Sequence, residues 1–209
     1  MVNEEINLLY SPSVGSKISR CMVVNGAVKS CEPIIVDGTV NGNIVCDDSV
    51  VVQKSGIVNG KIEAKTILLE GKVEGPLEAN TIELREEANL TGYILAKRAK
   101  IAGSVDGDIL AKEYLEVSKD ARLITYECVA DTMVVKGYIQ GEVTANIVLD
   151  IRASATIEGD IRVRELKAEG SSKIFGSISR IGVQDEASDS DSFVNIEGTQ
   201  EEEQLRHLG

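Results

Sequence analysis

One five-residue pattern recurs ten times along this chain: an aliphatic residue, any residue, a small residue that is nearly always glycine, any residue, and a second aliphatic residue. The central positions are Gly26, Gly42, Gly60, Gly75, Gly92, Gly107, Thr125, Gly141, Gly159 and Gly176. Successive centres lie 15 to 18 residues apart, and the nine intervals between residues 26 and 176 average 150/9, or about 17 residues. A unit this short cannot bury an apolar face by itself, so the pattern indicates a solenoid of stacked copies.

Apolar and polar residues alternate with a period of two around these centres. Beside Gly60, for example, Val58 and Ile62 fall on one face and Asn59 on the other. This alternation is typical of strands, and no helical periodicity competes with it in the repeats. Three strands of five or six residues, with their corners, fill a period of about 17 residues. The sequence therefore predicts an all-β fold, a triangular parallel β-helix of about nine to ten turns over residues 21–182.

The spacing also bears on the handedness of the coil. Left-handed β-helices of the hexapeptide type keep a coil of three equal sixes, about 18 residues, whereas here the interval varies from 15 to 18. Right-handed crossovers are the default between parallel strands, so we expect a right-handed β-helix. The glycine column fits either a crowded position or a corner that needs positive φ, and the sequence does not decide between them.

The seventh unit departs from the pattern. Residues 123–127 read Leu-Ile-Thr-Tyr-Glu, so that Glu127 stands where the second aliphatic residue belongs. Either the turn bulges, or the register slips by one residue and aims Ile124 and Cys128 at the core. A buried carboxylate without a partner is costly, so we expect the slip.

The C-terminal residues differ in composition from the repeats. Residues 183–209 hold eight acids against Arg206 as the single base, and so carry 1 − 8 = −7 of the total net charge of −12. The run at 185–192 is too polar to bury an apolar face. We therefore expect a disordered acidic tail over residues 183–209 and a flexible segment over residues 1–20. The negative charge argues against direct binding of nucleic acid, which needs a basic surface.

Nothing in the sequence points to export or to a membrane span. No stretch approaches the ~18 apolar residues in a row that a membrane helix needs, and the first twenty residues lack a secretory signal. We therefore expect a cytoplasmic protein. The four cysteines, Cys21, Cys31, Cys46 and Cys128, form no CxxC pair and show no metal-ligand spacing, so we expect them to be small buried hydrophobic residues.

The repeats resemble those of the bactofilins, polymer-forming bacterial cytoskeletal proteins. The similarity rests on Val-x-Gly-x-Ile units joined by Ala-Lys/Asn-Thr-Ile-x-Leu, as in residues 62–69 and 77–84, and on residues 155–178, which resemble the closing turns of that family. It covers residues 24–180. The resemblance implies a right-handed β-helix between flexible tails, end-to-end assembly without nucleotide, and roles at the membrane and in cell-wall patterning.

Two features depart from that family. The rod is longer than the usual core, and residues 90–105 already resemble a family ending before further turns begin. Residues 1–10 are acidic where some members carry a short apolar and basic membrane motif, so we expect contact with the membrane surface to be indirect. The partners implied are further copies of this chain and cell-wall or membrane-associated proteins, with a location in the cytoplasm at the inner face of the cell membrane.

The chain offers little for catalysis, although parallel β-helices also host acyltransferases, carbonic anhydrases and polysaccharide lyases. Such enzymes use a histidine base or several metal ligands, and the single histidine is His207, close to the last residue. Two acidic pairs, Asp106 with Asp108 and Glu158 with Asp160, flank motif glycines on the outward phase and are interpreted as solvated surface. There is no phosphate-binding loop. The sequence therefore predicts no enzyme, no metal site and no cofactor.

The two ends of such a rod leave open strand edges beside an apolar core, and neither flank offers a polar cap helix. Apolar residues crowd the first and last turns instead. The expected polymer interface comprises Met22, Val23, Val24 and Val28 at one end and Ile174, Phe175 and Ile178 at the other. Phe175, the one phenylalanine within the repeats, is interpreted as a plug over the end of the core, as a filament contact, or as both.

One outward column is mostly basic. Five residues after the motif centres it reads Asp47, Lys65, Asn80, Lys97, Lys112, Ala130, Asn146 and Arg164, with Arg98 beside it. Its bases are either solubilising charges or a docking track for an acidic partner or an anionic lipid surface. The residues of this docking stripe are Lys65, Lys97, Arg98, Lys112 and Arg164. The alternative to a polymer is accordingly a β-helical scaffold that does not polymerise and whose faces dock partner proteins.

Overall fold

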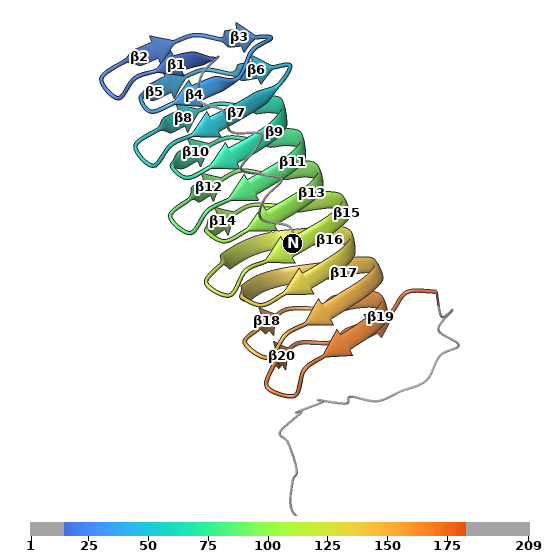
Figure 1. The fold of residues 1–209 in the computed structure, drawn as a ribbon. Coiled ribbons are helices and arrows are strands. Elements are labelled where there is room, and N and C mark those ends of the chain that lie inside the picture. The colour runs from blue at the N-terminus through green and yellow to red at the C-terminus, as the bar shows by residue number, and fades with distance from the viewer. Residues whose placement is uncertain (1–14, 183–209) are drawn as a thin grey trace, which may run out of the picture.

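The computed structural model describes residues 15–182, which form one rod of strands and corners (Figure 1). All 21 strands join a single sheet through parallel pairings. The predicted all-β parallel solenoid of about ten turns is therefore confirmed, and the right-handed sense of the coil stays a prediction. The predicted acidic tail, with His207, and most of the predicted N-terminal segment lie outside the described residues.

Each turn contributes three strand segments, and equivalent segments of successive turns stack into three ladders, here called the first, second and third sides. The first side consists of β2 (Val23–Asn25), β5 (Thr39–Asn41), β8 (Ile57–Asn59), β10 (Lys72–Glu74), β12 (Asn89–Thr91), β14 (Ser104–Asp106), the starts of β16 (Arg122–Val135) and β17 (Tyr138–Ile151), β18 (Thr156–Glu158) and β20 (Lys173–Phe175). The second side consists of β3 (Val28–Ser30), β6 (Ile44–Cys46), the first halves of β9 (Ile62–Leu69), β11 (Leu77–Leu84), β13 (Ile94–Ile101) and β15 (Ile109–Val117), the middles of β16 and β17, the first half of β19 (Ile161–Ala168), and β21 (Ile178–Arg180). The third side consists of β1 (Ser16–Ile18), β4 (Ile34–Val36), β7 (Ser49–Val52) and the remaining ends of the long strands.

The solenoid begins at β1, which pairs with β4 and lies inside the segment expected to be flexible, upstream of the predicted start at residue 21. The sequence misses this strand because it precedes the first glycine-centred unit. Ile18 is buried there and closes the third side of the first turn.

Variation in the period is absorbed at the corners. Between the second and third sides, β13 passes from Ala96 to Arg98 while β15 passes from Ala111 to Tyr114, so the register shifts by one residue. Similar shifts recur where β16 meets β15 and β17. The strands themselves keep their inward residues aligned, so a repeat of 15 to 18 residues still builds one continuous core.

The motif glycines stand at the corner between the first and second sides, and both explanations of their column hold. Gly60 has a φ of +152°, and a Cβ on it would lie 2.5 Å from the carbonyl oxygen of Gly42 in the preceding turn. The stacked corners approach too closely for any side chain, and the backbone conformation also favours glycine.

The seventh unit solves the same problem with a bulge, and the predicted register slip is wrong. Leu123 and Cys128 are both fully buried, whereas Ile124 is 38% exposed. Two residues, Thr125 and Tyr126, lie where β17 has a single glycine, so β16 carries one extra residue at this corner. The bulge turns Glu127 outward, which avoids the buried carboxylate that had argued for the slip.

Asp108 holds this bulge in place. One of its carboxylate oxygens, Oδ1, accepts hydrogen bonds from the backbone amides of Tyr126 and Glu127, each at 3.1 Å. Asp160 makes the equivalent contact in the ninth unit, where Oδ1 accepts from the backbone amide and the hydroxyl of Ser177. Both acids are exposed, as expected of a solvated face, and each one also binds the corner of the next turn.

Candidate assembly and docking surfaces

The N-terminal end of the rod exposes apolar side chains on an open turn. Val23 and Met22 are 62% and 48% exposed. Val24 and Val28 pack against the core but are only half-buried. In the next turn, Val40 is fully buried at the position equivalent to Val24. The difference in burial arises because the described chain places no turn over the first one.

An asparagine ladder runs up the outward face of this end. The side-chain amide of Asn59 donates to Oδ1 of Asn41 at 2.8 Å, and the amide of Asn41 donates to Oδ1 of Asn25 at 2.8 Å. The ladder ends at Asn25 in the first turn, where the Asn25 carboxamide stands at the rim. This column therefore offers a polar group beside the apolar residues of the end.

The C-terminal end has a similar composition but a different arrangement from the predicted one. Ile174 and Ile178 stack on the buried Ile157 and Ile161, and Ile178 is left 44% exposed because no described turn follows. Phe175 pairs with Glu158, points outward and is 58% exposed. Phe175 therefore lies on the flank of the last turn, and its interpretation as a plug over the core is wrong.

The docking stripe follows the corner between the second and third sides, here called the stripe corner. All five of its bases are exposed, and none forms an ion pair with any residue between 15 and 182. The bulge in β16 changes one position of the column. Ala130 is buried, and Asp131 takes the corner position, where it accepts a hydrogen bond from Asn146 at 3.0 Å. The stripe is therefore interrupted by an acid between Lys112 and Arg164.

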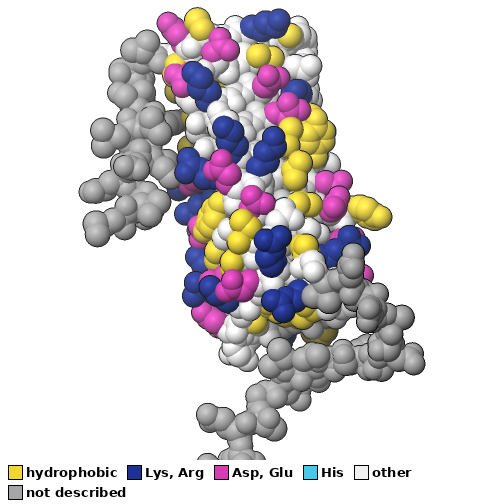
Figure 2. Space-filling view, turned by 90° about the vertical axis from the view of Figure 1, so that its right-hand side faces the viewer, with side chains coloured by type: hydrophobic (Ala, Val, Ile, Leu, Met, Phe, Trp, Pro, Cys, Tyr) yellow, Lys and Arg dark blue, Asp and Glu magenta, His cyan; other side chains and the backbone are white. Residues whose placement is uncertain are grey.

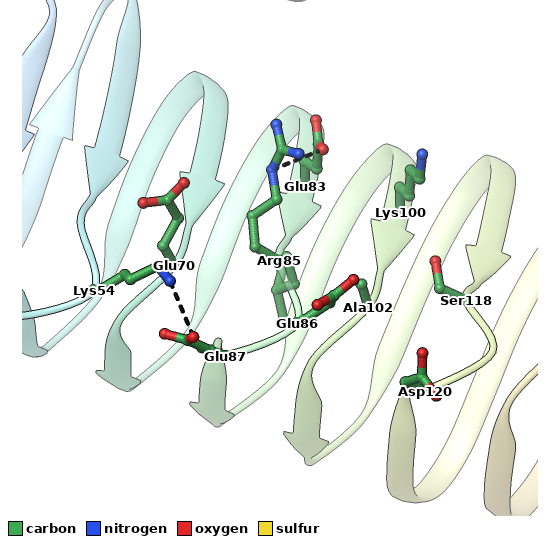
Figure 3. A pocket seen from close by; sticks show the side chains of 11 residues that line it. Lys54, Glu70, Glu83, Arg85, Glu86, Glu87, Lys100, Ala102, Ser118 and Asp120 are labelled. Atoms are coloured by element: carbon green, nitrogen blue, oxygen red, sulfur yellow. Dashed lines mark ion pairs between the residues drawn. The ribbon is translucent and has the colours of Figure 1, made fainter. Parts of the chain in front are cut away.

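A shallow groove lies along the opposite corner, between the third and first sides (Figure 3). Lys54 pairs with Glu87 at 3.0 Å across two turns, and Arg85 pairs with Glu83 at 3.1 Å. The first pair is exposed and the second joins an exposed arginine to a half-buried glutamate, so both are surface ion pairs of modest strength. Residues 15–182 bring together no group of three acids, cysteines or histidines that could hold a metal ion. Reading the sequence does not reveal this groove, because its charged residues come from corners that do not follow the glycine-centred pattern.

The cysteines divide into two classes, so the prediction that all four are buried is wrong for two of them. Cys46 and Cys128 are buried and Cys21 and Cys31 are exposed. Burial raises the pKa of the Cys128 thiol to about 12, with smaller contributions from Asp108 and Glu127. The exposed pair lies in the first turn and its following corner, outside the inward columns.

Within the described rod, no helix has the length and hydropathy of a membrane span.

Comparison with known proteins agrees with this architecture. The family model Bactofilin, described as polymer-forming cytoskeletal, matches the chain twice, over residues 16–102 and 95–179. The first match ends inside residues 90–105, the stretch that resembles a family ending. The two units share one rod, because β13 and β15 stay paired across this region on both sides of the register shift after Ala96.

Individual relatives cover about half of the chain. Bactofilin BacO of Myxococcus xanthus (strain DK1622) is 32% identical over 109 residues, which are 49% of this chain and 83% of that protein. Bactofilin BacP of the same organism is 29% identical over 100 residues, 44% of this chain and 42% of that protein. No solved structure matches the chain significantly. Since the two family matches together span nearly the whole rod, this chain belongs to the bactofilin family.

Proposed function

We propose that this bactofilin is a non-enzymatic structural protein whose rods assemble end to end, without nucleotide, into filaments or scaffolds. One observation carries the proposal: both ends of the described rod combine open strand edges with exposed apolar side chains. Val23 and Met22 occupy one end, and Ile178 with Phe175 occupies the other. The family description as polymer-forming cytoskeletal supports it.

A joint between two rods would satisfy both features at once. Bringing terminal turns together lets the three ladders continue across the junction, so that unpaired backbone groups find partners. The same contact removes the half-buried Val24, Val28 and Ile174 from water, which favours association in proportion to the apolar area covered. Neither the pairing of backbone groups nor the burial of apolar side chains involves a nucleotide or a metal ion, so assembly proceeds from protein contacts alone.

The proposed filament supports cell shape, the cell wall or polar organisation from the cytoplasm, with further copies of the chain as its main partner. Its contact with the inner face of the cell membrane is indirect and runs through membrane-associated or cell-wall proteins. The acidic sequence of residues 1–10 supports the indirect route, because anionic lipids repel it.

Electron microscopy tests the assembly directly. The purified full chain, in buffer with a chelator and without nucleotide, is examined by negative staining and by sedimentation over a range of protein and salt concentrations. Filaments or sheets under these conditions are the expected result. A monodisperse monomer at high concentration, unchanged by salt, contradicts the proposal and favours the scaffold that docks partners on its faces.

A further inference from the structure

The second side carries an unusual apolar column in the middle of the rod. Its outward positions are charged or polar in most turns, as at Glu78 and Thr144. In three successive turns between them, the same position holds Leu95, Leu110 and Val129. Leu110 is 42% exposed and the other two are half-buried. A continuous outward apolar stack of this kind marks a contact surface better than scattered single residues do.

Basic side chains border this column. Lys97 and Lys112 lie at the stripe corner, two residues after Leu95 and Leu110, and Arg98 follows directly. Figure 2 views the rod from the side of this corner and shows Lys and Arg side chains beside hydrophobic ones over the middle turns. Acids also stand at this corner: Glu113, Asp131 and Glu165 from Lys112 toward the C-terminus, and Asp47 and Asp48 nearer the N-terminus. Asn146 hydrogen-bonds to Asp131. The surface therefore suits an extended segment with apolar residues next to several acids.

The end of the described chain lies at the foot of this corner. In the last ladder step, Arg180 pairs with Val163, and the backbone amide of Ile181 donates to the carbonyl of Val163 at 2.9 Å. Ile181 thus stands below Arg164 of the docking stripe, and Gly182 ends the described rod there, on the right-hand side in Figure 1. Whatever follows Gly182 starts from the stripe corner.

The sequence that follows has the matching chemistry. Asp185, Glu186, Asp189 and Asp191 come first, and the apolar run at 193–196, Phe-Val-Asn-Ile, comes next. Five ladder steps lead from Arg180 up to Ala96 (β21, β19, β17, β16, β15, β13), a rise of about 24 Å at 4.8 Å a step. The eleven residues from Gly182 to Phe193 span up to about 36 Å when extended. The length of this segment and the order of its acidic and apolar residues both fit the surface of the rod.

We propose that the acidic C-terminal segment of this chain, residues 183–209, docks on its own rod along the stripe corner. Its acids lie against the bases of the stripe, and Phe193 and its neighbours cover the apolar column. The surface consists of Leu95, Leu110, Val129, Lys97, Arg98 and Lys112. The proposal does not depend on end-to-end assembly, because the contact lies within one chain and on the flank of the rod.

Photo-crosslinking of the full chain tests this contact. The photoreactive amino acid p-benzoylphenylalanine replaces Phe193, and the products are mapped by mass spectrometry in an equal mixture of isotope-labelled and unlabelled chains. The expected result is crosslinking to the apolar column within single chains, and loss of the crosslink in 1 M salt, where the Debye length is about 3 Å. Crosslinks spread evenly over the rod overturn the proposal. Crosslinks between labelled and unlabelled chains overturn it too, because a second copy is then the occupant.

Charge reversal provides the matched control. The surface variant K97E/R98E/K112E should lower the crosslink yield about tenfold, since three exposed pairs together contribute about 1.4 kcal/mol. Reversing the segment instead, with D185K/E186K/D189K/D191K, should lower it by a similar factor, and combining both sets should restore it. Circular dichroism verifies that each variant keeps the β-fold. An unchanged yield in either reversed variant, or no recovery in the combination, overturns the electrostatic match.

Discussion

A Cβ atom on Gly107 would lie 2.2 Å from the carbonyl oxygen of Gly92, in the turn directly before it. The φ of Gly107 is +141°, so alanine would meet both a steric clash and an unfavourable backbone conformation. We expect Gly107→Ala to lower the free energy of unfolding by about 3 kcal/mol or more. Urea denaturation followed by far-ultraviolet circular dichroism measures the change.

Gly26 provides the control for that substitution. Its φ is +130°, but no atom lies within 4 Å of the position that a Cβ would take. Gly26→Ala should therefore cost only the backbone strain, about 1–2 kcal/mol. Equal losses in the two variants would mean that conformation alone, and not the close approach of stacked corners, selects glycine in this column.

Ile109 tests the core. It is 1% exposed and sits inside the sixth turn, whereas the next residue, Leu110, points outward. Ile109→Asp buries an unpaired charge and should destabilise the rod by on the order of 4 kcal/mol. Thr144→Asp, at the equivalent outward position two turns further on and outside the apolar column, should change the free energy of unfolding by no more than about 0.5 kcal/mol. If the two variants denature at the same urea concentration, the alternation of inward and outward residues is misplaced here.

Asp108 should matter to stability although it is on the surface. Asp108→Ala removes the acceptor of two backbone amides in the bulge of the seventh unit, and should cost about 1–2 kcal/mol. Asp106→Ala, on the other side of Gly107, is the matched control and should be nearly neutral. Hydrogen exchange adds a local measurement: the amides of Tyr126 and Glu127 should exchange faster in Asp108→Ala alone. Unchanged exchange there would show that the bulge does not need the carboxylate.

The buried thiol of Cys128 makes the stability of the rod depend on pH. Since burial raises the folded-state pKa of Cys128 to about 12, the folded state holds this thiol proton more tightly than the unfolded chain does. The contribution to stability is complete below the ordinary thiol pKa, 9.0, and is lost as the pH rises from there toward 12. The Cys128→Ala variant should lose less stability than the parent over this range. Equal slopes of stability against pH in the two proteins would contradict this assignment.

Thiol reagents offer an independent measurement of the same environment. Cys21 and Cys31 are exposed and should react in the native rod, whereas Cys46 and Cys128 should react after unfolding. A count of four fast thiols under native conditions would mean that the inner columns open readily.

The ends of the rod control assembly in the proposed filament. Ile178→Arg places a charge at the open core end, and Phe175→Arg places one on the flank of the last turn. We expect both to abolish filaments in electron micrographs while circular dichroism stays unchanged. Ile57→Arg, on the flank of an interior turn, is the control and should polymerise normally. Filaments of normal length from Phe175→Arg would confine the joint to the core end, and normal filaments from both variants would remove this end from the interface.

The sequence predicts the fold well because the repeat leaves few alternatives. In the interior turns each glycine centre places Val58 or Ile62 and their equivalents inward, and the structure buries them fully. The sequence predicts less where one unit breaks the pattern. Whether Thr125 lies in a slipped strand or in a bulge depends on Asp108 in the turn before. Its carboxylate accepts hydrogen bonds from the Thr125 hydroxyl and from the amides of Tyr126 and Glu127, which are 17 to 19 residues away. Those contacts are invisible in the local alternation.

Contacts between turns also decide which features of the surface the sequence can predict. The stripe of Lys97 and Lys112 follows from counting residues, but its interruption at Asp131 follows from the extra residue of β16. Counting residues from the glycine centres does not reveal the apolar column of Leu95, Leu110 and Val129. These residues lie at ordinary outward positions of their strands and are unusual only in being apolar there. The outward direction of Phe175 becomes clear once Glu158 is known to be its ladder partner.

The tandem arrangement of two family-length units in one rod has a mechanical consequence. Covalent continuity replaces one non-covalent junction in every pair of units, so a filament of given length has about half the junctions of one built from single-unit rods. Thermal breakage and bending concentrate at junctions, whereas the paired turns between them resist both. At equal junction affinity, this bactofilin should form filaments that break less often per unit length and exchange material in longer pieces.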